Sequence, residues 1–374
     1  MGNYIGRSKN MQNTLAVLDA GRKSGIPTIL WGPPGVGKTA LVRALAAKYN
    51  LPLYILILST MDPTDLQGLP ALKKVVLPSG EEVTVTDNTL QYWSERLIRE
   101  GNGILFFDEI STAVPSMQAA GLSLFQGRML GRHVLSDDIW MIAAANEASD
   151  AADGWTLAAP MANRFIHINF EPDNNDFLEG MTVAWGNTVS DRENVERAKI
   201  VAFLKAYPTL INSMPKNAEE AGKAWPSYRS WDNLVTMLQY LDGTSPRAIA
   251  TRGAVGEKAA KQFSVFEDSL NLPNYDDVLS NPEKVEWKKR SSSEVYVILS
   301  MVLGRMSSEN VKSSAQVFAA AAKIGEKADV CTALAFPLMD KVRTSSDSKA
   351  DAAVVIGSVL REYAPYLKEA KLRF

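Results

Sequence analysis

Short apolar runs alternate with longer amphipathic segments over the first 170 residues of the chain. The apolar runs lie at residues 27–31, 51–59, 103–107, 139–145 and 165–170. Each has the length of a strand, and the amphipathic segments between them have helical periodicity. Because helices that connect buried strands cover a parallel sheet, this pattern predicts an α/β domain over residues 1–172.

Two further segments of this domain are predicted to form β-hairpins. In residues 73–87, stretches rich in valine at 74–77 and 82–85 flank the turn sequence Pro78-Ser79-Gly80. A shorter hairpin is expected over residues 127–137, with its turn at Gly131. Both hairpins would be insertions between strands of the sheet.

The strand pattern fades after residue 171, and Pro, Asn and Asp residues at 172–176 indicate a domain boundary. Beyond it, apolar residues recur at helical spacing in 192–206, 229–241 and 247–267, and again between 294 and 366. A polar, Pro-containing connection at 272–293 separates these two groups. We therefore expect an α-helical domain over residues 173–285 and a helical C-terminal extension over residues 286–374.

The composition is that of a globular protein, with 46% hydrophobic and 22% charged residues. The net charge of -2 provides no overall attraction to nucleic acid or anionic lipid. Cys331 is the only cysteine, so an intrachain disulfide is excluded. The two histidines, His133 and His167, lack metal-ligand spacing, which argues against a zinc site and a Ser-His-Asp triad. His167 falls in an apolar run and is expected to be a strand residue.

The chain contains no apolar run of the ~20 residues that a membrane-spanning helix needs. Its first residues also lack the basic and apolar regions of a signal peptide. We therefore expect a protein without a membrane segment, located in the cytoplasm.

A phosphate-binding loop pattern follows the first predicted strand. Its residues are Gly32, Pro33, Pro34, Gly35, Val36, Gly37, Lys38, Thr39 and, in the helix that follows, Ala40. Glycines let the backbone wrap around a polyphosphate, and the helix N-terminus adds a partial positive charge. In this pattern Lys38 contacts the β- and γ-phosphates of a nucleotide, and Thr39 ligates magnesium. The full match between a strand and a helix predicts a site for a nucleoside triphosphate and Mg2+.

Two adjacent carboxylates end the apolar run at 103–107. Asp108 would hold magnesium through water, and Glu109 would orient and deprotonate an attacking water. Open α/β sheets bind ligands at the carboxyl ends of their strands, which is where this pair is expected to lie. Asp108 and Glu109 therefore form a candidate Walker B pair.

Four more residues are candidates to complete such a site. Asn146 ends the apolar run at 139–145, and its amide would hold the attacking water near the γ-phosphate. Arg164 precedes the fifth predicted strand and is a candidate arginine finger, a guanidinium donated to the nucleotide of a neighbouring subunit. Arg229, at the start of a predicted helix, would reach back to the γ-phosphate, and Arg247 is an alternative with a similar local sequence.

In this order, the elements resemble those of the AAA+ ATPases, and within them the MoxR-like group, which is related to the dynein-type ATPases. The resemblance covers roughly residues 10–285. The phrases that carry it beyond the phosphate-binding loop lie at 62–70, 105–111, 143–146, 163–165, 229–231 and 253–260.

The resemblance implies a five-stranded core, a helical lid and a ring, usually of six subunits, with ATP and Mg2+ bound between subunits. The implied roles are phosphate and magnesium binding for Lys38 and Thr39, Walker B for Asp108 and Glu109, sensor one for Asn146, the finger for Arg164 and sensor two for Arg229. The two hairpins would correspond to insertions of the group that face the pore or a partner.

Proteins of this group act as chaperones that remodel or assemble other proteins, often beside a partner with a von Willebrand A-type domain. The first hypothesis is therefore a ring-forming, Mg2+-dependent ATPase that acts on a protein client. An alternative is a nucleotide-gated binding module with little turnover. A motor or loader acting on nucleic acid is less favoured, because the charge is near neutral and no basic stripe interleaved with aromatic residues stands out.

Overall fold

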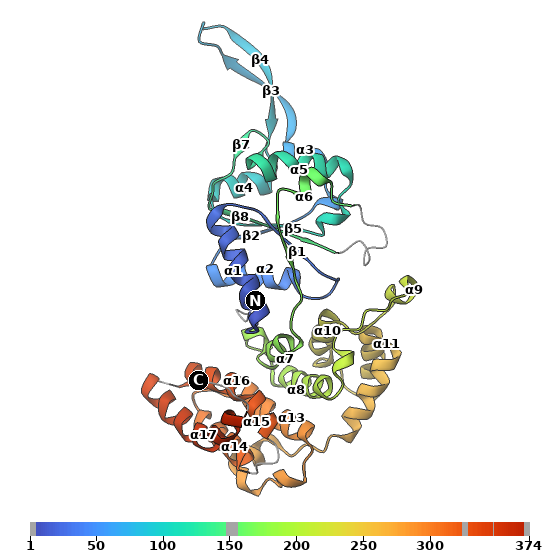
Figure 1. Cartoon of the computed structure of the whole chain (residues 1–374), viewed down its shortest axis with the longest axis vertical. Helices are drawn as coiled ribbons and strands as arrows, with labels where there is room; N and C mark the ends of the chain where they lie inside the picture. Colours follow the sequence, from blue (N-terminus) through green and yellow to red (C-terminus); the bar gives the residue numbers. More distant parts are fainter. Residues whose placement is uncertain (1–4, 147–155, 324–327, 347, 370–374) are drawn as a thin grey trace. The chain divides into compact units, whose positions relative to one another are not determined.

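A computed structural model describes residues 5–146, 156–323, 328–346 and 348–369 of the chain. The chain divides into two compact units, residues 1–173 and 174–374 (Figure 1). The first unit contains a large sheet and its helices, and the described part of the second consists of helices and their connections.

The first unit is built on a five-stranded parallel sheet with the strand order β2-β5-β8-β1-β9. The strands are β1 (Thr28–Trp31), β2 (Leu53–Ile57), β5 (Gly103–Asp108), β8 (Ile139–Ala145) and β9 (Ile166–Asn169). β8 is buried at every position and β5 at all but the last, which is why their sequences are continuously apolar. All the predicted strands are present, and the predicted α/β fold with a helical C-terminal region is confirmed.

Helices cover both faces of this sheet. They are α1 (Lys9–Ser24), α2 (Lys38–Tyr49), α3 (Pro63–Gln67), α4 (Tyr92–Glu100), α5 (Pro115–Gly127) and α6 (Ala159–Ala162). Phe107 of β5 contacts Phe125 of α5, with ring centroids 4.6 Å apart. Trp140 of β8 packs edge-on against Tyr49 of α2 at 5.8 Å. Because Trp140 is in register with Ile104 and side chains alternate along a strand, these two contacts lie on opposite faces.

Both predicted hairpins are present. β3 (Leu69–Val76) and β4 (Glu82–Thr89) pair antiparallel, and in Figure 1 they extend away from the sheet. The shorter hairpin consists of β6 (Met129–Leu130) and β7 (His133–Val134). The longer hairpin extends beyond the predicted residues 73–87 at both ends, where Pro70 pairs with Asn88. Proline and asparagine are uncommon in strands, so the sequence pattern predicted a hairpin that is too short at both ends.

The second unit is helical in its described part. Its helices are α7 (Asn174–Thr182), α8 (Asp191–Ala206), α9 (Ala218–Ala221), α10 (Tyr228–Leu238), α11 (Thr244–Ser269), α12 (Tyr275–Ser280), α13 (Ser292–Gly304), α14 (Val311–Ala322), α15 (Ala328–Ala333), α16 (Ala335–Ser345) and α17 (Lys349–Glu369). Short 3-10 helices in the two units lie at Leu58–Thr60, Ile110–Thr112, Ala184–Gly186, Pro208–Leu210, Pro282–Lys284 and Trp287–Lys289. The predicted division of this unit at residue 286 stays a prediction.

Two local features of this unit go beyond the sequence prediction. α11 includes the predicted helical segment 247–267 but contains a bend, because Gly256 interrupts it with a φ of 79° and a ψ of 166°. A Cβ added at Gly256 would lie 2.7 Å from the carbonyl oxygen of Ala224, so glycine is required at this bend. The connection at 272–293 contains the short helix α12, because the side chain of Asn274 caps it by accepting from the amide of Asp276 at 2.8 Å.

Over the described ranges, every helix is too short or too polar to cross a membrane.

Candidate functional site

The predicted phosphate-binding loop connects β1 to α2 at the carboxyl edge of the sheet. Its backbone is anchored where the amide of Gly32 donates to the carbonyl of Ala145, at the end of β8. Gly37 precedes α2 with a φ of 96°, a conformation that favours glycine. A Cβ added at Gly32 would lie 2.7 Å from the carbonyl oxygen of Phe170. The loop thus takes a path that only glycine allows at these two positions.

Lys38 lies at the start of α2 and is buried. Its Nζ donates to the carbonyl oxygens of Gly32 and Pro33, at 2.6 and 3.0 Å. It also donates to Oδ1 of Asn146 at 2.8 Å. The structure therefore brings two of the predicted site residues into contact, and it fixes a positive charge against the loop.

Thr39 and Asp108 form a second contact between predicted site residues. The Oγ1 hydroxyl of Thr39 donates to Oδ2 of Asp108 at 2.7 Å, which joins the first turn of α2 to the end of β5. Hydroxyl and carboxylate oxygens are ligands that Mg2+ prefers, and Mg2+ commonly keeps several of its waters. Among the described residues no group of three or more His, Cys, Asp or Glu side chains could hold a metal ion. Thr39 and Asp108, which were predicted to bind magnesium, lie within hydrogen-bond distance of each other.

Glu109 is exposed beside Asp108, with its backbone in the left-handed region at a φ of 54° and a ψ of 38°. Its amide donates to Oδ1 of Asp108 at 3.1 Å. Its carbonyl oxygen accepts from the hydroxyl of Thr112 at 2.7 Å. A glutamate in this conformation is strained, and such strain persists where the surrounding contacts hold the residue in place. The backbone of Glu109 is therefore fixed while its side chain faces solvent.

Arg164 lies in the turn between α6 and β9. Its Nη2 donates to Oε1 of Gln126 on α5 at 3.0 Å. In the described part of the chain, no hydrogen bond links Arg164 to residues 32–40. Gln126 could not be predicted as the partner of Arg164, because the two residues are 38 positions apart and no local pattern connects them.

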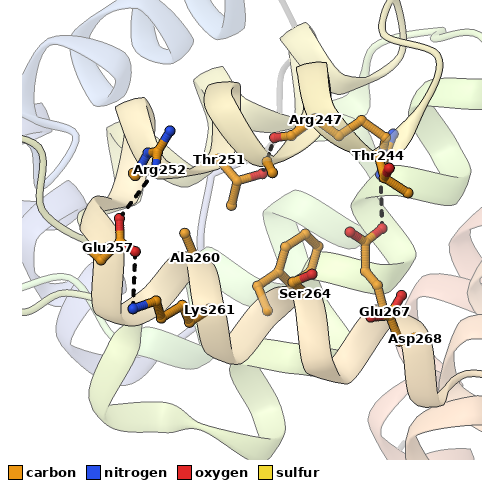
Figure 2. A pocket seen from close by; sticks show the side chains of 12 residues that line it. Thr244, Arg247, Thr251, Arg252, Glu257, Ala260, Lys261, Ser264, Glu267 and Asp268 are labelled. Carbon is orange, nitrogen blue, oxygen red and sulfur yellow. Dashed lines mark hydrogen bonds and ion pairs between the residues drawn. The ribbon is translucent and has the colours of Figure 1, made fainter.

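The two candidates for sensor two, Arg229 and Arg247, both lie in the second unit and differ in their surroundings. Arg229 is exposed in the first turn of α10. Arg247 lines a cavity of about 330 Å³ between the two arms of α11, as Figure 2 shows. Its Nη2 donates to Oε2 of Glu196 at 2.7 Å and to Oε1 of Glu267 at 2.8 Å. Burial opposes the charge of Arg247, but these two carboxylates raise its pKa above the usual value.

Comparison with known proteins identifies the family of this site. Residues 28–170 match the model of the ATPase family associated with various cellular activities (AAA). NorQ of Paracoccus denitrificans is 31% identical over 147 residues, which are 39% of this chain and 47% of NorQ. The denitrification regulatory protein NirQ of Pseudomonas aeruginosa is 28% identical over 171 residues, 45% of this chain and 54% of NirQ.

A third relative is the chaperone protein ClpB of Helicobacter hepaticus, with 31% identity over 212 residues, 55% of this chain and 23% of ClpB. The chain thus spans about half the length of NorQ and NirQ and less of ClpB. NorQ and NirQ are MoxR-like AAA+ proteins. The family model and these relatives confirm the predicted resemblance: residues 28–170 match the AAA model, and this chain is similar to MoxR-like AAA+ ATPases.

Proposed function

We propose that this chain hydrolyses ATP in a Mg2+-dependent reaction, and that it does so in a ring that remodels or assembles protein clients. The observation that carries the proposal is the contact of four predicted site residues at one edge of the sheet. Lys38 bonds to Asn146, and Thr39 bonds to Asp108. These four side chains come from three segments of the chain, and all lie where α/β sheets bind their ligands.

The residues of the loop fit a triphosphate. The Lys38 ammonium is a buried donor that phosphate oxygens would share with the loop carbonyls, and the N-terminus of α2 adds its partial positive charge. Thr39 and Asp108 would hold the magnesium ion, Thr39 directly and Asp108 through water. Bound there, Mg2+ would neutralise charge that develops on the phosphates.

Glu109 would be the general base of the reaction. Its carboxylate would accept a proton from water that attacks the γ-phosphate, and the fixed backbone of Glu109 would limit where that carboxylate can reach. The amide of Asn146, held by Lys38, would orient the same water.

Two arginines would act from outside this cluster. AAA+ proteins generally form oligomeric rings, and Arg164 would be the finger given to the neighbouring subunit's nucleotide. Arg229 would be sensor two, because it is exposed and Arg247 is engaged by Glu196 and Glu267. These surroundings support Arg229 over Arg247. A ring of six subunits is the assembly that we propose.

The long hairpin supports a role in contacting a protein. Leu72 and Val76 of β3 are 79% and 66% exposed, and large apolar side chains on a protruding hairpin are typical of a contact surface. We propose that this hairpin contacts the client or a partner with a von Willebrand A-type domain, and that the complex works in the cytoplasm. The shorter hairpin would contribute to the same surface.

Two variants test the proposed reaction. Glu109→Gln should retain ATP binding and lower the rate of phosphate release by at least about 100-fold, because it removes the base. Lys38→Ala should weaken ATP binding itself. Phosphate release and nucleotide affinity would be measured on the same preparations. Hydrolysis by Glu109→Gln at the wild-type rate would show that Glu109 is not the base. Negligible wild-type turnover, with partner affinity that differs between ATP and ADP, would favour a nucleotide-gated binding module.

A further inference from the structure

A hydrogen-bonded chain of three residues connects the phosphate-binding loop to the turn that carries Arg164. Trp31, the last residue of β1, donates from Nε1 to Nδ1 of His167 on β9 at 2.9 Å. The Nε2 atom of His167 lies 2.9 Å from the carbonyl oxygen of Ala162, the last residue of α6. The indole and imidazole planes lie within 10° of parallel.

This geometry determines the proton position on His167. An indole nitrogen can only donate, so Nδ1 of His167 must carry no proton to accept from Trp31. A carbonyl oxygen can only accept, so Nε2 of His167 must carry the proton that bonds Ala162. Only the neutral ring with its proton on Nε2 makes both bonds, because a charged imidazole would have no acceptor for Trp31.

The hydrogen-bonded series begins and ends at segments that have a role in the proposed reaction. Trp31 is followed directly by Gly32, the first residue of the phosphate-binding loop. The carbonyl oxygen of Ala162 also accepts from the amide of Phe165 at 3.2 Å, so it closes the turn that contains Arg164. His167 therefore braces this turn from the strand that pairs with β1.

We propose that His167 is a positioning residue that holds the turn of Arg164 in place for use by the neighbouring subunit. The proposal rests on the proposed function, since it concerns how the finger is held. His167 would not contact the nucleotide. It would hold the turn through its hydrogen bond to the carbonyl oxygen of Ala162, and the hydrogen bond from Trp31 would fix its tautomer.

Mixed assemblies separate the chain that donates the finger from the chain that hydrolyses ATP. In a mixture of Arg164→Ala with Glu109→Gln subunits, turnover requires Glu109 of the first chain and Arg164 of the second. His167→Leu placed in the Glu109→Gln chain should lower turnover about five-fold, the effect of losing one neutral hydrogen bond. The same change in the Arg164→Ala chain should alter turnover by less than about two-fold, because that chain donates no finger.

Three variants serve as controls in the same mixtures. Gln at position 167 offers one acceptor and one donor, so His167→Gln in the finger-donating chain should restore most of the lost turnover. Trp31→Phe in that chain should reproduce the loss, and Val265→Ala, at an exposed position of α11, should have no effect. Equal losses from His167→Leu in either chain, or a loss confined to the Arg164→Ala chain, would overturn the proposal.

Nuclear magnetic resonance of histidine nitrogens tests the hydrogen bonds of His167 with Trp31 and Ala162 without relying on ATP hydrolysis. The chain has only two histidines, so His133→Gln leaves His167 as the single imidazole. In the full chain at mildly alkaline pH, His167 should show the tautomer protonated on Nε2, and Trp31→Phe should change its Nδ1 shift. A proton on Nδ1 would overturn the proposal even if the mixed assemblies hydrolyse ATP. Failure of the parent mixture to hydrolyse ATP would instead count against the finger role of Arg164.

Discussion

Two side-chain hydrogen bonds assemble the candidate site across long stretches of the chain. The bond from Lys38 to Asn146 spans 108 residues, and the bond from Thr39 to Asp108 spans 69 residues. Each connects the start of α2 to the end of a strand that lies in the interior of the sheet. Because both strands are buried, the residues at their ends are held in place, as a preorganised site requires.

Replacement of Thr39 tests the proposed role of this single residue in binding Mg2+. Thr39→Ala removes the hydroxyl that bonds Asp108, so half-maximal turnover should require at least about ten-fold more Mg2+, in line with losses at other metal sites. Chelation of Mg2+ should abolish turnover altogether. The measurement is phosphate release as a function of Mg2+ concentration at saturating ATP. Thr84→Ala on the exposed face of β4 is the matched control, and an unchanged Mg2+ requirement in Thr39→Ala would contradict the assignment.

The residue identities of the loop and the carboxylate pair could be predicted from sequence because each follows a buried strand directly. The left-handed backbone of Glu109 could not, since glutamate rarely adopts it and the cause is the turn at Ile110–Thr112. The bond between Trp31 and His167 also gave no local signal, because it depends on two strands being neighbours. His167 was predicted to be a strand residue, which is confirmed, but its partners follow from topology.

At the scale of the elements, helix α11 bends at Gly256, and an ion pair connects its two arms. Arg247 in the first arm bonds to Glu267 in the second arm and to Glu196 on α8, and Lys199 lies 3.4 and 3.3 Å from the same two carboxylates. Figure 2 shows the two arms facing each other across the cavity. Hydrophobic periodicity alone predicts helix on both sides of Gly256, and it carries no information on the angle between them.

The contrast between Arg247 and Arg229 gives a prediction for the helical unit. Arg247→Ala should lower the free energy of unfolding by about 1–3 kcal/mol, because it leaves the partly buried carboxylates of Glu196 and Glu267 without their main partner. Arg229→Ala should change stability by less than about 0.5 kcal/mol but lower ATP turnover. Urea unfolding and phosphate release would be measured for both variants. The reverse pattern would assign sensor two to Arg247.

Helices α1 and α2 are joined by a charge cluster whose effect depends on pH. Lys23, Arg22 and Tyr49 donate to the carboxylate of Asp19 and lower its pKa from 3.8 to about 2, although burial opposes this shift. A lowered pKa stabilises the fold while the carboxylate is charged, so the contribution is complete above about pH 4 and is lost as the pH falls towards 2.

Asp19→Asn should therefore lower stability at neutral pH by less than about 1 kcal/mol, since the cluster is partly exposed to solvent. The difference between this variant and the wild type should shrink below pH 4 and vanish near pH 2. Urea midpoints over this pH range provide the measurement. A difference that does not change with pH would show that charge on Asp19 contributes nothing to the contact between these helices.

At the scale of the whole molecule, the candidate residues are divided between the two units. The loop, the carboxylate pair, Asn146 and Arg164 belong to the first unit, and Arg229 belongs to the second. Arg164 is proposed to serve a neighbouring subunit, so no single chain would contain a complete site. The order of strands and helices along the chain indicated a change from α/β to helical structure near residue 172, close to the boundary between the two units, and the predicted division at residue 286 stays a prediction. The proposed assembly of several chains into a ring would depend on surfaces that hydrophobic periodicity does not describe.

The most direct test of this account combines two inactive variants. Glu109→Gln lacks the proposed base but keeps Arg164, and Arg164→Ala lacks the proposed finger but keeps Glu109. Each variant alone should show almost no phosphate release. Subunits mixed under conditions where joint assembly is demonstrated should regain turnover at interfaces that unite an intact Glu109 with an intact Arg164. Mixed assemblies that remain inactive, or substantial hydrolysis by either variant alone, would contradict the account.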